Sequence, residues 1–231
     1  MIESTLAQQT ILILGLGETG SAAARWCVQQ GAQVRIADTR LQPPGLETLQ
    51  ALGVEQAAWF LGEEQCYSKA ALAGVQSLVL SPGLEPNEPK LSAFLEIARA
   101  ASVEIIGEIE LFARALADLA QAQEYQPKLL AVTGTNGKTT VTTMVRDMCL
   151  QAGKTVRAAG NISPSALTAL MQALEEEQLP EIWVLELSSF QMVTTESLNP
   201  QASVVFNITQ DHLDCHGTSA HYATRKAKLP T

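Results

Sequence analysis

The chain has 231 residues, of which 46% are hydrophobic and 17% are charged, a composition typical of a soluble globular protein with room for two domains. Its formal net charge of −9 argues against a nucleic-acid partner, because a phosphate backbone is bound by clustered Lys and Arg. No apolar run approaches the ~20 residues that span a bilayer, and the first residues do not resemble a signal peptide. We therefore expect a cytoplasmic protein without membrane insertion.

The first half of the chain predicts a doubly wound α/β domain. Residues 10–14 form an apolar strand that runs into the motif G-x-G-x-x-G at residues 15–20, and a second strand over 33–37 ends in Asp38. This order is the fingerprint of a dinucleotide-binding domain, although the same glycines can serve only to pack a helix against a strand. Further elements are expected as strands over 75–80 and 103–106 and helices over 90–101 and 108–119.

A polar, Ala-rich stretch over residues 120–128 separates this half from the next. We place a domain boundary there, near Gln126, so that 1–126 form a Rossmann-like domain and 127–231 form a second one. In the second part the alternation of strand and helix restarts, which predicts another parallel sheet. Its expected strands are 129–133, 155–159, 182–187 and 202–206, with one helix ending at Ala152 and another over 166–177.

The motif GTNGKTT at residues 134–140 lies between a predicted strand and a predicted helix. Its glycines let the backbone turn so that successive N–H groups and the positive end of the helix face an anion. Lys138 supplies a charge for the outer phosphates and Thr139 supplies a hydroxyl for magnesium. Val132 stands where a general P-loop has its first glycine, so this is a variant loop. The alternative is a glycine turn that only caps the helix.

Polar residues follow the later strands. Glu186 comes at the end of a predicted strand, where a carboxylate beside a phosphate loop can bind magnesium, although a helix cap or a solvated side chain is the simpler alternative. The histidines all lie between His212 and His221. His212 and His216, with acidic residues and a cysteine nearby, are similar to a zinc ligand set, but nothing else in the sequence completes a tetrahedral site.

Together these motifs resemble the Mur ligases of peptidoglycan synthesis, and those of the first half are similar to the members of the family that add D-glutamate. The resemblance covers essentially the whole chain. It implies a Rossmann-like first domain and a P-loop α/β central domain. The motifs that carry it are residues 134–140, 186–191, 207–209 and 211–214, Tyr222 with Lys226, and in the first half residues 15–20, 38–40, 81–83 and 108–112.

The resemblance implies an ATP-driven amide bond. The γ-phosphate of ATP would pass to the L-alanine carboxylate of UDP-N-acetylmuramoyl-L-alanine, and the amine of D-glutamate would attack the acyl phosphate. Lys138 would neutralise the moving phosphoryl group, and Thr139 would hold a first Mg²⁺. Glu186 and His212 would hold a second Mg²⁺ beside Lys226, which family members carry in carbamylated form. The implied ATP-binding residues are Gly134, Thr135, Asn136, Gly137, Lys138, Thr139 and Thr140.

The resemblance also assigns the UDP part of the substrate to the first domain, in place of NAD. The implied contacts for uracil, diphosphate and sugar are Thr19, Asp38, Thr39, Arg40, Gly83, Asn161, Ser188 and Gln191. In the family the chain runs on past the position of Thr231, so we expect these 231 residues alone to be an inactive part of the ligase. The alternatives are a non-catalytic module that binds nucleotide sugars and, more distantly, an NAD-dependent oxidoreductase.

Overall fold

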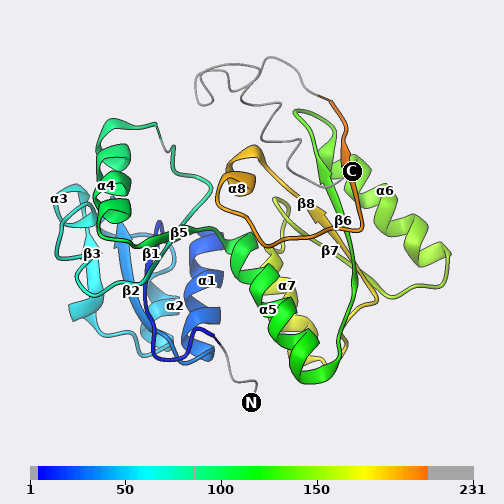
Figure 1. The fold of residues 1–231 in the computed structure, drawn as a ribbon, viewed down its shortest axis with the longest axis horizontal. Helices are drawn as coiled ribbons and strands as arrows, with labels where there is room; N and C mark the ends of the chain where they lie inside the picture. The colour runs from blue at the N-terminus through cyan, green and yellow to red at the C-terminus, as the bar shows by residue number, and fades with distance from the viewer. Residues whose placement is uncertain (1–4, 86, 208–231) are drawn as a thin grey trace. The chain divides into compact units, whose positions relative to one another are not determined.

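The structure is a computed structural model that describes residues 5–85 and 87–207. The chain forms two compact units, Met1–Leu111 and Phe112–Thr231, and each contains its own parallel sheet (Figure 1). The predicted α/β class is confirmed for both. Helix α5 (Glu108–Gln123) contains the division between the two units, after Leu111, whereas Gln126 lies in the segment that follows the helix. The domain boundary near Gln126 stays a prediction.

The sheet of the first unit has the order β3-β2-β1-β4-β5, and all of its neighbouring strands are parallel. The strand order reverses between β1 and β4, which makes that junction the switch point where open sheets bind ligands. The strands are β1 (Thr10–Leu14), β2 (Gln33–Asp38), β3 (Trp59–Leu61), β4 (Ser77–Leu80) and β5 (Glu104–Ile106). The helices are α1 (Glu18–Gln29), α2 (Leu46–Ala51), the short 3-10 helix η1 (Gln56–Ala58), α3 (Glu63–Cys66) and α4 (Pro89–Ala100).

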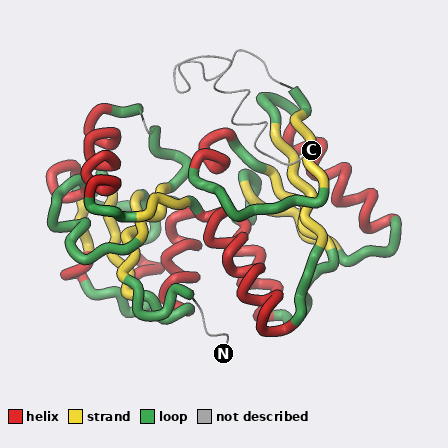
Figure 2. Tube along the Cα trace, in the orientation of Figure 1, coloured by secondary structure: helices red, strands yellow, loops and turns green. Residues whose placement is uncertain are grey.

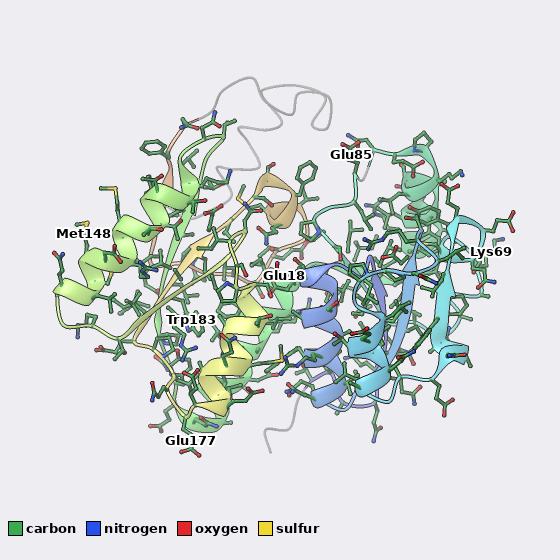
Figure 3. The ribbon with its side chains drawn as sticks, turned by 180° about the vertical axis from the view of Figure 1, so that it is seen from behind. Glu18, Lys69, Glu85, Met148, Glu177 and Trp183 are labelled. Atoms are coloured by element: carbon green, nitrogen blue, oxygen red, sulfur yellow. The ribbon has the colours of Figure 1, made fainter. Side chains whose placement is uncertain are left out.

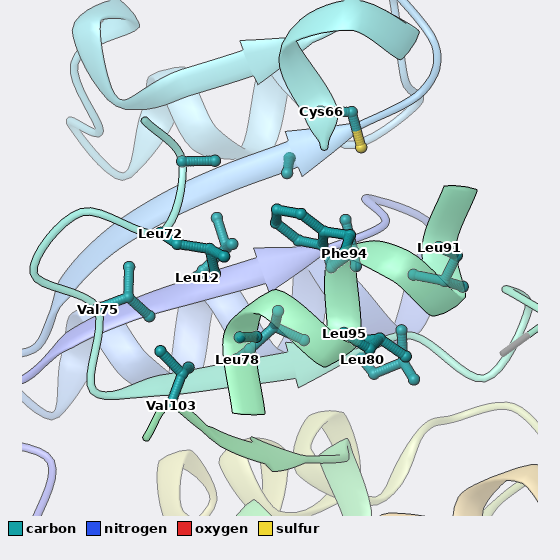
Figure 4. Packing of buried hydrophobic residues seen from close by; sticks show 14 residues of the cluster. Leu12, Cys66, Leu72, Val75, Leu78, Leu80, Leu91, Phe94, Leu95 and Val103 are labelled. Atoms are coloured by element: carbon teal, nitrogen blue, oxygen red, sulfur yellow. The ribbon is translucent and has the colours of Figure 1, made fainter. Parts of the chain in front are cut away.

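One face of this first sheet packs against helix α4. Leu12 of β1 and Leu78 and Leu80 of β4 meet Phe94 and Leu95 of the helix in a cluster of buried apolar side chains (Figure 4). A parallel sheet needs such cover because both of its faces are apolar. This packing holds β1 and β4 firmly side by side, so the loops at their carboxyl ends are fixed in relation to each other.

The second unit has a sheet in the order β7-β8-β6-β9, again with all neighbouring strands parallel. Figure 2 shows the strands of each unit lying among its helices. The strands are β6 (Lys128–Thr133), β7 (Val156–Gly160), β8 (Ile182–Glu186) and β9 (Ala202–Val205). The remaining helices are α6 (Lys138–Gln151), α7 (Ala166–Glu175) and α8 (Ser189–Val193).

Trp183 is the largest buried side chain of the second unit (Figure 3). Its ring meets that of Phe112 edge-on, with ring centroids 5.2 Å apart, and its indole N–H donates to the hydroxyl of Tyr125 at 2.9 Å. That hydroxyl in turn donates to the carbonyl of Pro180 at 2.7 Å, and burial raises the pKa of Tyr125 to about 12. The segment before β6 is therefore tied to the segment before β8, which aligns the starts of the two strands.

Within residues 5–85 and 87–207, no helix combines the length and the apolar character that crossing a membrane requires.

Candidate functional site

A cavity of about 340 Å³ lies at the carboxyl ends of β1, β2 and β4, at the switch point of the first sheet. It is lined by the glycine loop after β1, by residues 38–40 at the end of β2 and by residues 81–84 after β4. The structure brings together at this cavity the five candidates that the sequence places in the first unit, namely Thr19, Asp38, Thr39, Arg40 and Gly83. Cys66 and Tyr67 also line it, and the sequence analysis missed them because they follow β3, a strand of three residues.

The glycine loop brings helix α1 close to the two central strands. Gly15 has a positive φ of 90°, and its carbonyl oxygen accepts a hydrogen bond from the Ser81 hydroxyl at 2.7 Å. A Cβ on Gly20 would lie 1.9 Å from that same carbonyl oxygen. The last glycine of the motif is therefore required for close packing of α1 against the strands. As a result, the first residues of α1 line the cavity.

Asp38 is buried, with 3% of its surface exposed, and its carboxylate accepts four hydrogen bonds. Oδ1 accepts from the backbone N–H and the Nε of Arg40 at 2.8 and 2.9 Å. Oδ2 accepts from the N–H of Leu16 and from a terminal nitrogen of Arg40, both at 2.7 Å. Both oxygens are thus engaged within the protein. In a dinucleotide-binding domain this carboxylate would accept from a ribose hydroxyl, so its engagement disfavours an NAD site.

The charge of Asp38 should stabilise the first unit. Burial by itself raises the pKa of this carboxyl group, but the hydrogen bonds from Arg40 and Leu16 outweigh burial and lower the pKa below its ordinary value. A lowered pKa stabilises the fold above the unfolded value of about 3.9, and this contribution is lost as the pH falls through the folded pKa. Asp38→Asn should lower the free energy of unfolding by about 2 kcal/mol at pH 7.

Urea unfolding measures the free energy of unfolding of Asp38→Asn and of the unchanged protein, at pH 7 and at about pH 3. Glu47→Gln, which changes an exposed carboxylate, is the control. The difference between Asp38→Asn and the unchanged protein should shrink toward zero at the lower pH. An equal difference at both pH values would contradict the role of the charge.

The phosphate loop of the second unit joins β6 to α6. Gly137 precedes the helix with a left-handed φ of 78°, and Lys138 Nζ donates to the carbonyl of Thr135 at 3.2 Å. Thr139 and Thr140 lie exposed in the first turn of α6. The first N–H groups of a helix have no partner within it and lie at the positive end of its dipole, so this turn can bind an anion.

Glu186 ends strand β8, where it pairs with Val132 of β6 on one side and with Gly160 of β7 on the other. Its side chain is 2% exposed, and Oε1 accepts from the Asn161 amide at 2.9 Å. Oε2 has no hydrogen-bond partner in the part of the chain that the structure describes. A buried carboxylate oxygen without a partner is costly, and a cation is one way to satisfy it. Glu186 therefore fits a magnesium ligand beside the phosphate loop.

Asn161 reaches Glu186 because Gly160 makes a sharp turn. Gly160 has a φ of 115°, and a Cβ there would lie 2.3 Å from the backbone oxygen of Glu186. The N–H of Asn161 donates to this oxygen at 2.7 Å. The structure thus brings together two candidates that lie 25 residues apart in the sequence.

Ser188 and Gln191 form a capping box at the start of α8. The Ser188 hydroxyl accepts from the N–H of Gln191 at 3.2 Å, and the Gln191 side-chain oxygen accepts from the N–H of Ser188 at 2.9 Å. These oxygens thus have a structural role, while the hydroxyl proton of Ser188 is a further donor. Substrate contacts by these two residues stay a prediction.

His212 and Lys226, assigned to a metal site from the sequence, lie outside the described residues, as do the other residues of the zinc alternative. Between residues 5 and 207, leaving out residue 86, no three His, Cys, Asp or Glu side chains gather as a metal site would require. Within this range Glu186 is the candidate ligand that the structure supports, through its unpartnered oxygen.

Two family models match the chain: a Mur ligase MurD-like N-terminal domain over residues 9–107 and a Mur ligase middle domain over residues 132–231. The UDP-N-acetylmuramoylalanine--D-glutamate ligase of Bordetella avium is 57% identical over 220 residues, which are 95% of this chain and 43% of the relative. The ligase of the same name from Ralstonia nicotianae is 50% identical over 224 residues, 97% of this chain and 44% of the relative. The chain therefore spans less than half the length of these relatives.

A solved structure supports the fold. The UDP-N-acetylmuramate:L-alanyl-gamma-D-glutamyl-meso-diaminopimelate ligase from Neisseria meningitides is similar to this chain with a TM-score of 0.56 and 18% sequence identity. The match covers 97% of this chain and 69% of that one.

Proposed function

This chain belongs to the Mur ligase family, and on that premise we propose that it serves the ATP-dependent addition of D-glutamate to UDP-N-acetylmuramoyl-L-alanine in the cytoplasm. The observation that carries the proposal is the buried, unpartnered carboxylate oxygen of Glu186 next to a phosphate loop. Hydride transfer by a dehydrogenase does not require a second phosphate site with a metal ligand. A ligase that forms an acyl phosphate requires a phosphate site for ATP and a metal ion beside it.

In the first unit, the cavity takes the UDP part of the substrate. The N-terminus of α1 and the glycine loop offer N–H groups to the diphosphate. Arg40 is held by Asp38 and has a 51% exposed side chain, so it presents a fixed cation to the nucleotide. A guanidinium that is already held loses little entropy when the ligand binds. Thr19, Thr39 and Gly83 supply the remaining contacts from around the cavity.

In the second unit, the loop over residues 134–140 binds the phosphates of ATP. Lys138 neutralises charge on the transferred phosphoryl group, the Thr139 hydroxyl is a ligand for a first Mg²⁺, and Glu186 is a ligand for a second. Bound Mg²⁺ would offset negative charge on the phosphate oxygens during transfer. His212 and a carbamylated Lys226 complete the second metal site in this proposal, and Asn161 holds Glu186 in place.

Titration calorimetry of the purified chain with UDP-N-acetylmuramoyl-L-alanine and with NADH tests the substrate assignment. We expect binding of the nucleotide sugar, and we expect Arg40→Ala to weaken it about 10-fold, because a charge-assisted hydrogen bond is lost. Arg99→Ala, which removes an exposed arginine of α4, is the matched control. Tighter binding of NADH than of the nucleotide sugar would end the ligase proposal for the first unit.

A further inference from the structure

Asn207, which follows strand β9, binds the phosphate loop with its side chain. Its Oδ1 accepts from the N–H groups of Thr135 and Asn136, both at 2.9 Å, and its Nδ2 donates to the carbonyl of Asn136 at 2.9 Å. The backbone carbonyl of Asn207 also accepts from the N–H of Thr135, at 3.2 Å. One carboxamide therefore satisfies two donors and one acceptor of a loop that lies 71 residues earlier in the chain.

The residue before Asn207 fixes the other side of the loop. The N–H of Phe206 donates to the carbonyl of Thr133 at 2.8 Å, which continues the pairing of β6 with β9. A Cβ on Gly137 would lie 3.1 Å from the Phe206 ring, and one on Gly134 would lie 3.3 Å from the N–H nitrogen of Asn207. The absence of side chains at these glycines thus lets Phe206 and Asn207, which follow β9, contact the loop directly.

This arrangement limits which N–H groups can bind phosphate. The N–H groups of Thr135 and Asn136 already donate to the side chain of Asn207, and that of Thr135 also donates to its backbone carbonyl, so an incoming phosphate would have to displace Asn207 to use them. The N–H groups from Gly137 to Thr140 lie at the start of α6, where a helix leaves its donors without internal partners. Phosphate can bind there while the Asn207 contacts remain.

We propose that Asn207 is a positioning residue: it sets the conformation of the phosphate loop and leaves the N–H groups of residues 137–140 to bind the phosphates of ATP. The inference rests on the proposed function for its ligand, but the contact between Asn207 and the loop does not. Asparagine suits this role because it can accept and donate at once without bringing a charge near the phosphates. Aspartate would keep the two acceptor contacts, lose the donor and add a negative charge.

Amide hydrogen exchange of the whole chain, read residue by residue by NMR, tests the contact. Asn136 is exposed, so protection of its amide has to come mainly from the hydrogen bond to Asn207. Asn207→Ala should speed exchange at Asn136 by at least about 10-fold and leave the β6 and β8 amides unchanged. The effect at Thr135 should be smaller, because its N–H keeps the backbone carbonyl of residue 207 as an acceptor. Asn207→Asp should keep most of this protection. A general loss of protection across the unit, or none at all, would overturn the proposal.

Titration with MgATP tests the consequence for binding. Asn207→Ala should weaken MgATP binding about 10-fold because the loop must be ordered at the moment of binding. Asn207→Asp should weaken MgATP binding more than Asn207→Ala does. The difference in affinity between Asn207→Asp and the unchanged chain should become smaller at high salt, because salt screens the added charge. Asn199→Ala and Asn199→Asp make the same changes at an exposed asparagine before β9 and should have no effect.

Tighter binding of MgATP by Asn207→Ala would mean that the phosphates take N–H groups that Asn207 otherwise occupies, and equal binding would mean that affinity does not depend on the ordering by Asn207. Either result would overturn the proposal. If the unchanged chain does not bind MgATP, the proposed use of ATP by this chain fails. The exchange rate at Asn136 then still decides whether the Asn207 side chain positions the loop.

Discussion

Gly20→Ala should destabilise the first unit by about 3 kcal/mol or more and abolish binding of the nucleotide sugar. The added Cβ would lie 1.9 Å from the carbonyl oxygen of Gly15 and 3.0 Å from the Ser81 hydroxyl oxygen. The first of these is a backbone atom that cannot rotate away, so either α1 or the loop after β1 has to move. Overpacking that forces a backbone shift costs ~1–3 kcal/mol, and loss of the hydrogen bond between Ser81 and Gly15 adds ~1 kcal/mol.

The same loop provides a matched control. Gly17 has no atom within 4 Å of an added Cβ and no positive φ, so Gly17→Ala should cost about 1 kcal/mol or less, mostly through its position before the first turn of α1. Urea unfolding of both variants gives the comparison. Equal stability of the two would show that α1 is not packed against the strands as closely as the structure has it.

The strands at the centre of each sheet were predictable because they are short apolar runs that end in glycine or polar residues. The strand predicted over 10–14 is β1 without any shift, and the strand predicted over 75–80 starts two residues later, at Ser77 of β4. Five short elements, α2, η1, β3, α3 and α8, were missed. β3 has three half-buried residues paired with β2, and so short a segment carries no hydrophobic period of its own.

The sequence grouped the candidate residues by motif, and the structure adds their local partners. It could not indicate that Asp38 uses both carboxylate oxygens within the protein, because Leu16 lies 22 residues away and reaches it only through the pairing of β1 with β2. The contact of Asn207 with the phosphate loop depends in the same way on the pairing of β6 with β9. In contrast, the capping box of Ser188 and Gln191 has a local pattern, serine followed three residues later by glutamine, but we did not use it to predict helix α8.

Glu186→Gln should weaken the binding of a second divalent cation by on the order of 100-fold, because an amide is a poor substitute for a carboxylate ligand and even indirect changes around a metal cost 10- to 100-fold. The substitution keeps the side-chain shape, and the oxygen that accepts from Asn161 can remain in place. The pairing of strand β8 should therefore be unchanged, since the backbone pairs of Glu186 with β6 and β7 do not involve the side chain.

Mn²⁺ can stand in for Mg²⁺ in this measurement, because its bound and free forms are distinguished by electron paramagnetic resonance. The chain is first saturated with MgATP and then titrated with Mn²⁺, so that the ion carried by the nucleotide is already in place and the second one is counted. Glu124→Gln removes an exposed carboxylate from the same unit and should bind both ions as the unchanged chain does. If Glu186→Gln bound the second ion equally well, the unpartnered oxygen of Glu186 would not be a metal ligand, and the main support for ligase chemistry in the second unit would be gone.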